Sequence, residues 1–189
     1  MRLFTAINFN DATRSRLVSI RDEIKSKSAR GNFTAPQNIH LTLIFLGESD
    51  ERQFAAAKSA LDSTKFAPFD IEIYTTGRFA RDGGDIWWAG VRECAPLTDL
   101  YKDLFDKLTG AGFRVDARRY KPHITLSREV VINKRPYTNS EQARKLPPAE
   151  TVVSKFEPFG EKVYSVDLMK SERLHGNLVY TKIYSTLAD

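Results

Sequence analysis

Cysteine is almost absent from this sequence, since Cys94 is the only one among 189 residues. A lone cysteine cannot form a disulfide within the chain, and it cannot build a cysteine-rich zinc site. Long apolar runs are also missing: no segment approaches the roughly 18 consecutive apolar residues of a membrane-spanning helix. The N-terminus has no apolar run long enough for a secretory signal. We therefore expect a cytoplasmic protein with no membrane partner.

Neither sign of charge dominates the composition. The 29 basic and 24 acidic residues give a formal net charge of +5, and the chain is 41% hydrophobic. These values are typical of a globular protein long enough to bury a substantial core. The small basic excess favours an anionic partner such as a nucleotide or RNA. A solvated basic surface without such a partner is the alternative, and charge alone does not separate the two.

Histidine is scarce as well, yet two of the three histidines lie in the same sequence pattern. A His-x-Thr-Leu tetrapeptide begins at His40 and again at His123, 83 positions later (123 − 40). Side chains alternate between the two faces of an extended strand. His40 and Thr42 therefore share one face, as do His123 and Thr125, while aliphatic residues anchor the other. Each copy presents an imidazole and a hydroxyl side by side.

Two such pairs in one cleft suit the in-line hydrolysis of a phosphodiester. An unperturbed histidine titrates near pH 6.5, so both protonation states are available near neutrality. One imidazole can take a proton from the attacking water while the other delivers one to the departing oxygen. The threonine hydroxyls can donate hydrogen bonds to the non-bridging oxygens. A single His-x-Thr pattern could equally have only a structural role in a strand, but two copies in one chain favour a catalytic role.

Other catalytic designs have no counterpart in the sequence. Neither tetrapeptide belongs to a His-x-His or His-Glu-x-x-His pattern, and no carboxylate cluster of metal-ligand type lies nearby. A nucleophilic serine or cysteine elbow is absent too. We expect a reaction that needs no metal and no other cofactor.

Apolar periodicity and turn signals predict an α+β fold. Strands are expected at 3–9, 39–46, 69–75, 77–79, 86–91, 122–127, 163–169 and 178–185, and helices after 10–11, after 49–50 and from 96 to about 110. Segments 25–31 and most of 129–151 are predicted to be loops. Because no linker divides the chain, residues 1–189 are expected to form one bilobal catalytic domain, with two related lobes that bring both motifs to one cleft.

The two motifs and their surroundings resemble the 2H phosphoesterase superfamily, and within it the LigT-like branch of RNA 2′,3′-cyclic phosphodiesterases, also described as 2′-5′ RNA ligases. The resemblance covers nearly the whole chain. Outside the motifs it is carried by Arg2–Phe4, Ala6, Ile7, Phe45–Glu48, Gly77–Phe79, Trp88–Val91, Arg128, Leu168, Ser171, Gly176 and Tyr180.

This resemblance implies two pseudo-twofold-related lobes of mainly antiparallel sheet with outer helices. It implies metal-independent hydrolysis of 2′,3′-cyclic phosphate ends of RNA to 2′-phosphomonoesters, and a reverse, ATP-independent ligation to a 5′-hydroxyl. By position, His40 corresponds to the acid for the leaving 3′-oxygen and His123 to the base that activates water. Thr42 and Thr125 correspond to phosphate-binding residues, assisted by Arg128.

Some assignments remain open at this level. Strict alternation from His123 places Arg128 on the opposite strand face, so it reaches the phosphate only if the strand ends or twists. His175 has no partner motif and is interpreted as a loop residue. Basic residues near the second motif either follow an RNA backbone or form a solvated face; they are Arg118, Arg119, Lys121, Lys134 and Arg135. Three aromatic residues could either stack on RNA bases or belong to the hydrophobic core; they are Phe9, Phe79 and Tyr180.

Two other functions compete with the first. The same mechanism could act on a small cyclic nucleotide or on an ADP-ribose cyclic phosphate. From a different class, the chain could be a non-catalytic module that binds RNA ends, although binding alone would not need two titrating groups. In each case we expect a monomer.

Overall fold

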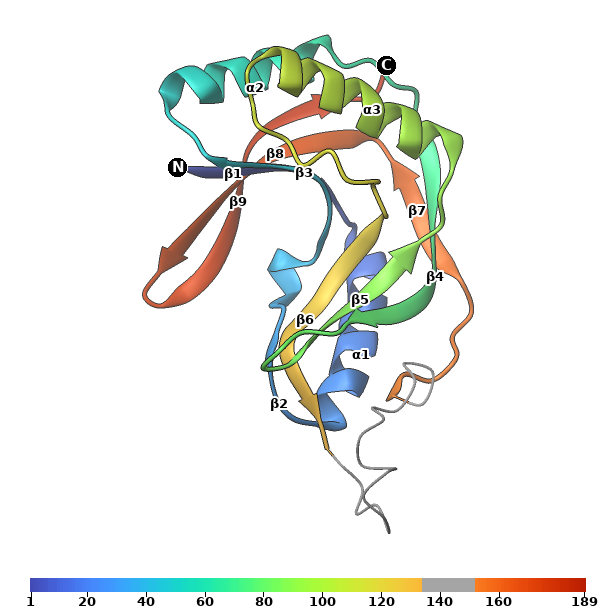
Figure 1. Cartoon of the computed structure of the whole chain (residues 1–189). Coiled ribbons are helices and arrows are strands. Elements are labelled where there is room, and N and C mark those ends of the chain that lie inside the picture. Colours follow the sequence, from blue (N-terminus) through green and yellow to red (C-terminus); the bar gives the residue numbers. More distant parts are fainter. Residues whose placement is uncertain (134–151) are drawn as a thin grey trace.

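The computed structural model describes residues 1–133 and 152–189. Its strands form two antiparallel sheets (Figure 1), which we call the first sheet, in the order β3-β1-β8-β9, and the second sheet, in the order β2-β6-β5-β4-β7. Helices α2 and α3 lie over the first sheet, and α1 packs against the second. The expected α+β architecture is confirmed, with one motif in each sheet.

The element bounds place both tetrapeptides at the start of a strand. The first sheet contains β1 (Arg2–Asn8), β3 (His40–Glu48), β8 (Ser165–Leu174) and β9 (Asn177–Leu187). The second contains β2 (Ser28–Phe33), β4 (Phe69–Phe79), β5 (Asp85–Val91), β6 (His123–Ile132) and β7 (Phe159–Val163). The helices are α1 (Asp11–Ser26), α2 (Glu51–Ser63) and α3 (Ala95–Gly110), and a single 3-10 turn, η1 (Pro36–Asn38), precedes β3.

The helices begin where the sequence signals them. The Asn10 side chain accepts a hydrogen bond from the Thr13 amide and caps α1. Asp50 and Gln53 form a reciprocal capping box at the start of α2. Pro96 occupies the first turn of α3, where a missing N–H costs nothing. None of these described helices is both long enough and apolar enough to cross a membrane.

One loop prediction was wrong, and a second is tested only at its first residues. Segment 25–31 contains the start of β2, whose mostly polar residues show no apolar alternation because β2 is an edge strand of the second sheet. Segment 129–151 begins with the last residues of β6, which continues to Ile132. The rest of that segment, 134–151, lies outside the described residues. A further strand, β7, was not predicted and pairs with β4 at the opposite edge.

The aliphatic residues of the motifs form the inner face of the fold. Leu41 and Ile124 are both 0% exposed, and both belong to one continuous core that the helices help to cover. Each histidine is therefore attached to a strand whose reverse side is fixed in the core. Rotation of either strand about its axis would expose these aliphatic residues to water.

We expect Leu41→Ala to lower the free energy of unfolding by about 2–5 kcal/mol, because it deletes buried methyl groups and leaves a cavity. On the same strand Phe45 is 60% exposed, so Phe45→Ala is the matched control and should cost far less. Urea denaturation at neutral pH measures both. Equal losses in the two variants would contradict the faces assigned to β3.

Candidate active site

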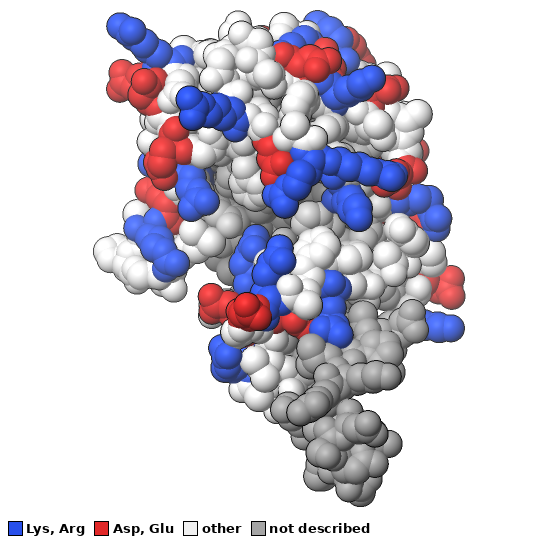
Figure 2. All heavy atoms as spheres, in the orientation of Figure 1, with Lys and Arg blue, Asp and Glu red and all other residues white. Residues whose placement is uncertain are grey.

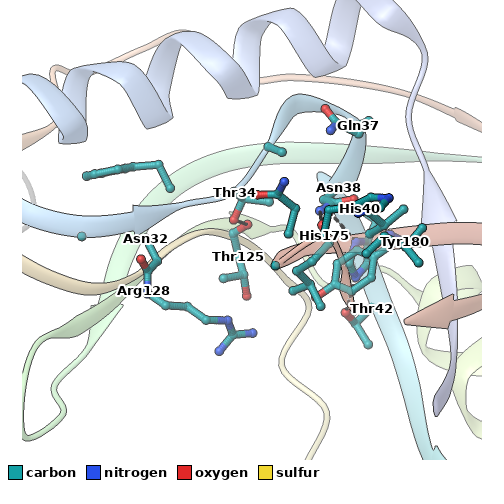
Figure 3. A pocket seen from close by; sticks show the side chains of 18 of the residues that line it. Asn32, Thr34, Gln37, Asn38, His40, Thr42, Thr125, Arg128, His175 and Tyr180 are labelled. Atoms are coloured by element: carbon teal, nitrogen blue, oxygen red, sulfur yellow. Dashed lines mark hydrogen bonds between the residues drawn. The ribbon is translucent and has the colours of Figure 1, made fainter. Parts of the chain in front are cut away.

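A cavity of about 700 Å³ lies between the two sheets, within the usual size range of small-ligand sites. Its walls come from β3, β6, the segment from β2 to η1, and the hairpin that joins β8 to β9 (Figure 3). Side chains that can hydrogen-bond or carry charge line it; among them are Asn32, Thr34, Gln37, Asn38, His40, Thr42, Thr125, Arg128, His175 and Tyr180. Figure 2 shows Lys and Arg side chains around the hollowed centre of one molecular face.

The His40 ring is held by hydrogen bonds at both nitrogens. Nδ1 lies 2.8 Å from the carbonyl oxygen of Asn38, which can only accept, so Nδ1 carries the proton and donates it. Nε2 lies 2.9 Å from Oγ1 of Thr42. In the neutral ring Nε2 is therefore an acceptor for the threonine hydroxyl. The pair predicted from the sequence is in contact in the structure.

His123 repeats half of this arrangement on β6. Its Nδ1 donates to the carbonyl oxygen of Lys121 at 2.7 Å, again the residue two positions earlier in the chain. In both rings Nδ1 is therefore engaged by a backbone carbonyl, and Nε2 is the nitrogen without the proton in the neutral form. His123 does not itself line the cavity, but it shares a strand face with Thr125, which does. Its ring borders Phe79 and Trp88, with centroids 5.3 and 6.3 Å away.

A β-bulge places Arg128 on the cavity side of β6. Thr125 pairs with Trp88 and Ser127 pairs with Trp87, so two steps along β6 match one step along β5. Thr125 and Ser127 therefore point to opposite faces, and Arg128 returns to the face of Thr125. Strict alternation predicted the opposite face; that prediction was wrong because of the extra residue.

The first motif carries the same irregularity. On β3, Thr42 pairs with Ala6 and Ile44 pairs with Thr5, again two steps against one. Phe45 consequently lies on the face of Thr42 and lines the cavity, while 60% of its surface stays exposed. It is the counterpart of Arg128, since both stand five positions after their histidine. The two lobes thus repeat the backbone geometry and differ in the chemistry of this side chain.

Burial and charge both disfavour the protonated form of His40. Desolvation is the larger cause and Arg128 the smaller, and together they lower the pKa of His40 from 6.5 to about 4, against the opposing hydrogen bond to Asn38. His40 is therefore neutral at pH 7 in the free protein. The effect of Arg128 also shows that its guanidinium, carried by the second sheet, acts on a histidine of the first.

The backbone carbonyl of each motif threonine accepts a hydrogen bond from a side chain outside the motif strand. The Tyr120 hydroxyl donates to the carbonyl oxygen of Thr42 at 3.1 Å. On the other wall, the Thr34 hydroxyl donates to the carbonyl oxygen of Thr125, also at 3.1 Å. Tyr120 precedes β6 and Thr34 follows β2, so each motif strand is held by a residue from outside its own sheet ladder. The Tyr120 bond joins the segment before β6 to β3 in the other sheet, and it therefore limits how far the walls can separate.

The β8–β9 hairpin closes over the His40 side. Asn38 donates to the carbonyl oxygen of Leu178 at 2.8 Å and accepts from the amide of Tyr180 at 3.3 Å. The Tyr180 ring then lies 5.2 Å from that of His40 and 5.0 Å from that of Phe4 (centroids). Tyr180, for which the sequence left base stacking and a core position open, packs on Phe4 and also lines the cavity.

Sequence reasoning missed three contributors. His175, interpreted as a loop residue, lies at the hairpin tip with φ 50° and lines the cavity. Asn38 and Phe45 were not singled out at all. Comparison of the two motifs would have pointed to these positions: Asn38 and Lys121 both stand two residues before their histidine, and Phe45 and Arg128 both stand five residues after it.

Two of the basic residues near the second motif have acidic partners. Arg118 pairs with Asp116, and Arg119 lies 3.2 Å from Glu93, so acidic neighbours offset both charges. Lys134 and Arg135 lie outside the described residues. Within residues 1–133 and 152–189, no group of three or more His, Cys, Asp or Glu side chains is placed to hold a metal ion.

We expect a histidine NMR titration to give His40 a pKa of about 4 in the free protein. Arg128→Gln should raise this pKa, yet leave it below 6.5, because desolvation is the larger cause. Saturating inorganic phosphate should raise it as well, since a bound anion stabilises the imidazolium. With three histidines in the chain, His40→Gln identifies the signal, and Arg52→Gln, an exposed change on α2, is the control. A free-protein value near 6.5 would contradict the buried setting.

Comparison with known proteins supports the geometry. The family model of the 2′-5′ RNA ligase superfamily matches residues 11–158. The chain is 34% identical over 164 residues to an Archaeoglobus fulgidus protein named RNA 2′,3′-cyclic phosphodiesterase, covering 85% of each chain. A protein of the same name from Methanothermobacter thermautotrophicus is 28% identical, over 96% of this chain and 95% of its own.

The crystal structure of E. coli LigT complexed with 3′-AMP has the same fold, with a TM-score of 0.79 and 24% identity, over 99% of this chain and 97% of that chain. The chain belongs to the 2′-5′ RNA ligase superfamily.

Proposed function

We propose that the protein hydrolyses 2′,3′-cyclic phosphate ends of RNA or oligonucleotides to 2′-phosphomonoesters by two-histidine acid-base catalysis. The observation that carries the proposal is the repeated geometry. Two His-x-Thr pairs stand on facing strands, and each Nδ1 is engaged by a backbone carbonyl, so each Nε2 is left for chemistry. The names of the relatives, RNA 2′,3′-cyclic phosphodiesterase, support the same reaction.

In the proposed reaction His123 is the base and His40 the acid. Nε2 of His123 takes a proton from water as its oxygen bonds to phosphorus. The bond from phosphorus to the 3′-oxygen breaks, and Nε2–H of His40 gives that oxygen a proton. The 2′-ester bond stays intact. Thr42, Thr125 and Arg128 stabilise the charge on the non-bridging oxygens.

The low pKa of His40 in the free protein fits an acid that becomes protonated when the anionic substrate binds. The free protein keeps His40 neutral, because the ring is buried and Arg128 lies near it. A bound cyclic phosphate would bring a negative charge between these groups. That charge offsets Arg128 and favours the imidazolium, so the pKa of His40 rises when substrate is present.

The shape of the cavity supports this assignment of acid and base. The leaving 3′-oxygen remains attached to the nucleoside, so the acid must stand on the side where the nucleoside lies. The 700 Å³ cavity is lined by His40 and by the hairpin beside it, and His123 is not among its lining residues. His123 would then face the side from which water enters. A 5′-hydroxyl in that position would give the reverse ligation.

The decisive experiment supplies the purified chain with adenosine 2′,3′-cyclic phosphate and with an oligonucleotide ending in a cyclic phosphate. We expect hydrolysis of both, with the phosphate retained on the 2′-hydroxyl, as read by ³¹P NMR of the product. Tight binding without turnover would favour a module that only binds RNA ends. A monomeric, cytoplasmic protein remains our prediction.

We expect His40→Ala and His123→Ala each to lower the rate of cyclic phosphate hydrolysis by about 10²-fold or more, the usual loss when acid-base assistance is removed. The double variant should lose little beyond the worse single variant, because the two groups act in one step. Thermal unfolding shows whether the variants remain folded, and Arg52→Gln is the charge control on the outer helix. Near-normal turnover in either single variant would refute the assigned roles.

Activity should persist in excess EDTA, because the proposed proton transfers and charge stabilisation use only side chains of this chain. The measurement compares kcat/KM before and after dialysis against EDTA, then after addition of Mg²⁺, Mn²⁺ or Zn²⁺. Loss in EDTA with recovery on adding one of these ions would refute the metal-independent scheme.

A further inference from the structure

The cavity face of the first sheet continues past Thr42 along β1. Thr42 pairs with Ala6, Phe45 pairs with Phe4, and the next residue of β1 on that face is Arg2. From Ala6 to Arg2 the strand rises roughly 13 Å at about 3.3 Å per residue, and an arginine side chain can reach back over part of that length. The proposed phosphate site, an aromatic surface and a cation thus follow one another on one face.

The register brings Arg2 and Tyr180 into one row. Ser171 of β8 pairs with Arg2 on one side and with Tyr180 on the other, so the three side chains share a face of the sheet. Burial raises the pKa of Tyr180, whereas the charges of Arg128 and Arg2 act to lower it. The Tyr180 hydroxyl therefore lies in the field of two guanidiniums, one from each sheet.

Neither guanidinium forms a salt bridge within the described part of the chain. The acid nearest to Arg2 by register is Glu48 on β3, but its Oε2 lies 3.7 Å from the Met1 amine. Arg2 is exposed on a strand that is flanked by β3 and β8, so it is not at a sheet edge. Two cations without salt-bridge partners, one on each sheet and both acting on the pKa of Tyr180, favour binding of two anions.

The surface between the two cations is aromatic. Phe45 is 60% exposed and stacks against Phe4, with ring centroids 5.9 Å apart. An exposed ring of this size in a cavity wall suits a flat or apolar group of a ligand. A nucleoside has that character, and in a nucleotide chain it separates one phosphate from the next. The order of cation, aromatic surface and cation is that of a nucleoside with a phosphoryl group at each end.

We propose that Arg2, with Tyr180, forms a second phosphate subsite that binds the 5′-phosphoryl group of the nucleotide whose cyclic phosphate lies at His40. This inference rests on the proposed function and deepens it. The preferred substrate carries a second phosphate: an oligonucleotide has one, whereas a nucleoside 2′,3′-cyclic phosphate has only the cyclic phosphate. Arg2 is a specificity-determining residue that contacts the substrate away from the reacting atoms.

Three substrates separate the contributions: adenosine 2′,3′-cyclic phosphate, the same compound with a 5′-phosphate, and the dinucleotide ApA with a cyclic phosphate end. We expect kcat/KM about tenfold higher for the last two, since a charge-assisted hydrogen bond is among the strong ones. Arg2→Gln should lower both to the level of the first and leave the first unchanged. Arg2→Lys should retain part of the preference, because it keeps the charge but not the planar fork.

An equilibrium measurement tests the subsite without turnover. Adenosine 2′,5′-bisphosphate should bind wild-type protein about tenfold tighter than adenosine 2′-monophosphate, and Arg2→Gln should abolish the difference. The slope of log affinity against log salt for the bisphosphate should fall by about 0.7 in Arg2→Gln, the value for one phosphate contact on a single strand. Arg52→Gln, which removes an exposed charge from α2, should change neither quantity.

The outcomes are distinguishable. Equal affinity of wild-type protein for the two nucleotides, or a preference that survives in Arg2→Gln, overturns the subsite. If the binding difference holds while no cyclic phosphate is hydrolysed, the subsite stands and the proposed function fails. A preference for the dinucleotide without one for the 5′-phosphorylated mononucleotide also overturns it, because the contact would then lie beyond the phosphate.

Discussion

The hydrogen bond from Nδ1 of each histidine to the carbonyl oxygen two residues earlier is the interaction on which the site depends. It fixes the tautomer and the ring orientation, so that Nε2 is the nitrogen free to exchange a proton. The acceptor in each bond is a backbone carbonyl at the entry to the strand, so the bond does not depend on which side chain stands two residues before the histidine. It recurs because both strands begin with the same backbone geometry. Leu41 and Ile124, buried on the reverse face, hold each strand in that position.

The paired bulges are the second constraint, because they determine what accompanies each histidine. An extra residue after each threonine returns the fifth position to the cavity face, as Arg128 on β6 and Phe45 on β3. One lobe thereby presents a cation to the cavity and the other an aromatic ring. A pseudo-symmetric backbone in this way gives the two walls different chemistry, as the proposed substrate, which is not symmetric, requires.

His40 and Arg128 show how the two lobes act on each other. Burial and the guanidinium keep the imidazole neutral in the free protein, and an anion between them reverses the balance of charge. In the mechanism that we propose, the acid is therefore charged only when substrate is present. The hairpin of β8 and β9, clamped by Asn38, supplies the burial on which this depends.

The sequence by itself determined both motifs, the helices α1 to α3 and the family, because buried periodicity, helix caps and a repeated His-x-Thr pattern are local signals. It missed β2, a polar edge strand, left the strand face of Arg128 open, and gave His175, a turn residue as predicted, no place in the site. In each case a partner elsewhere in the chain decides the outcome: β6 pairs with β2, a two-against-one register with β5 reverses the face of Arg128, and closure of the hairpin brings His175 to the cavity. Only the tertiary structure could decide these, because pairing register and cavity shape depend on residues far apart in sequence.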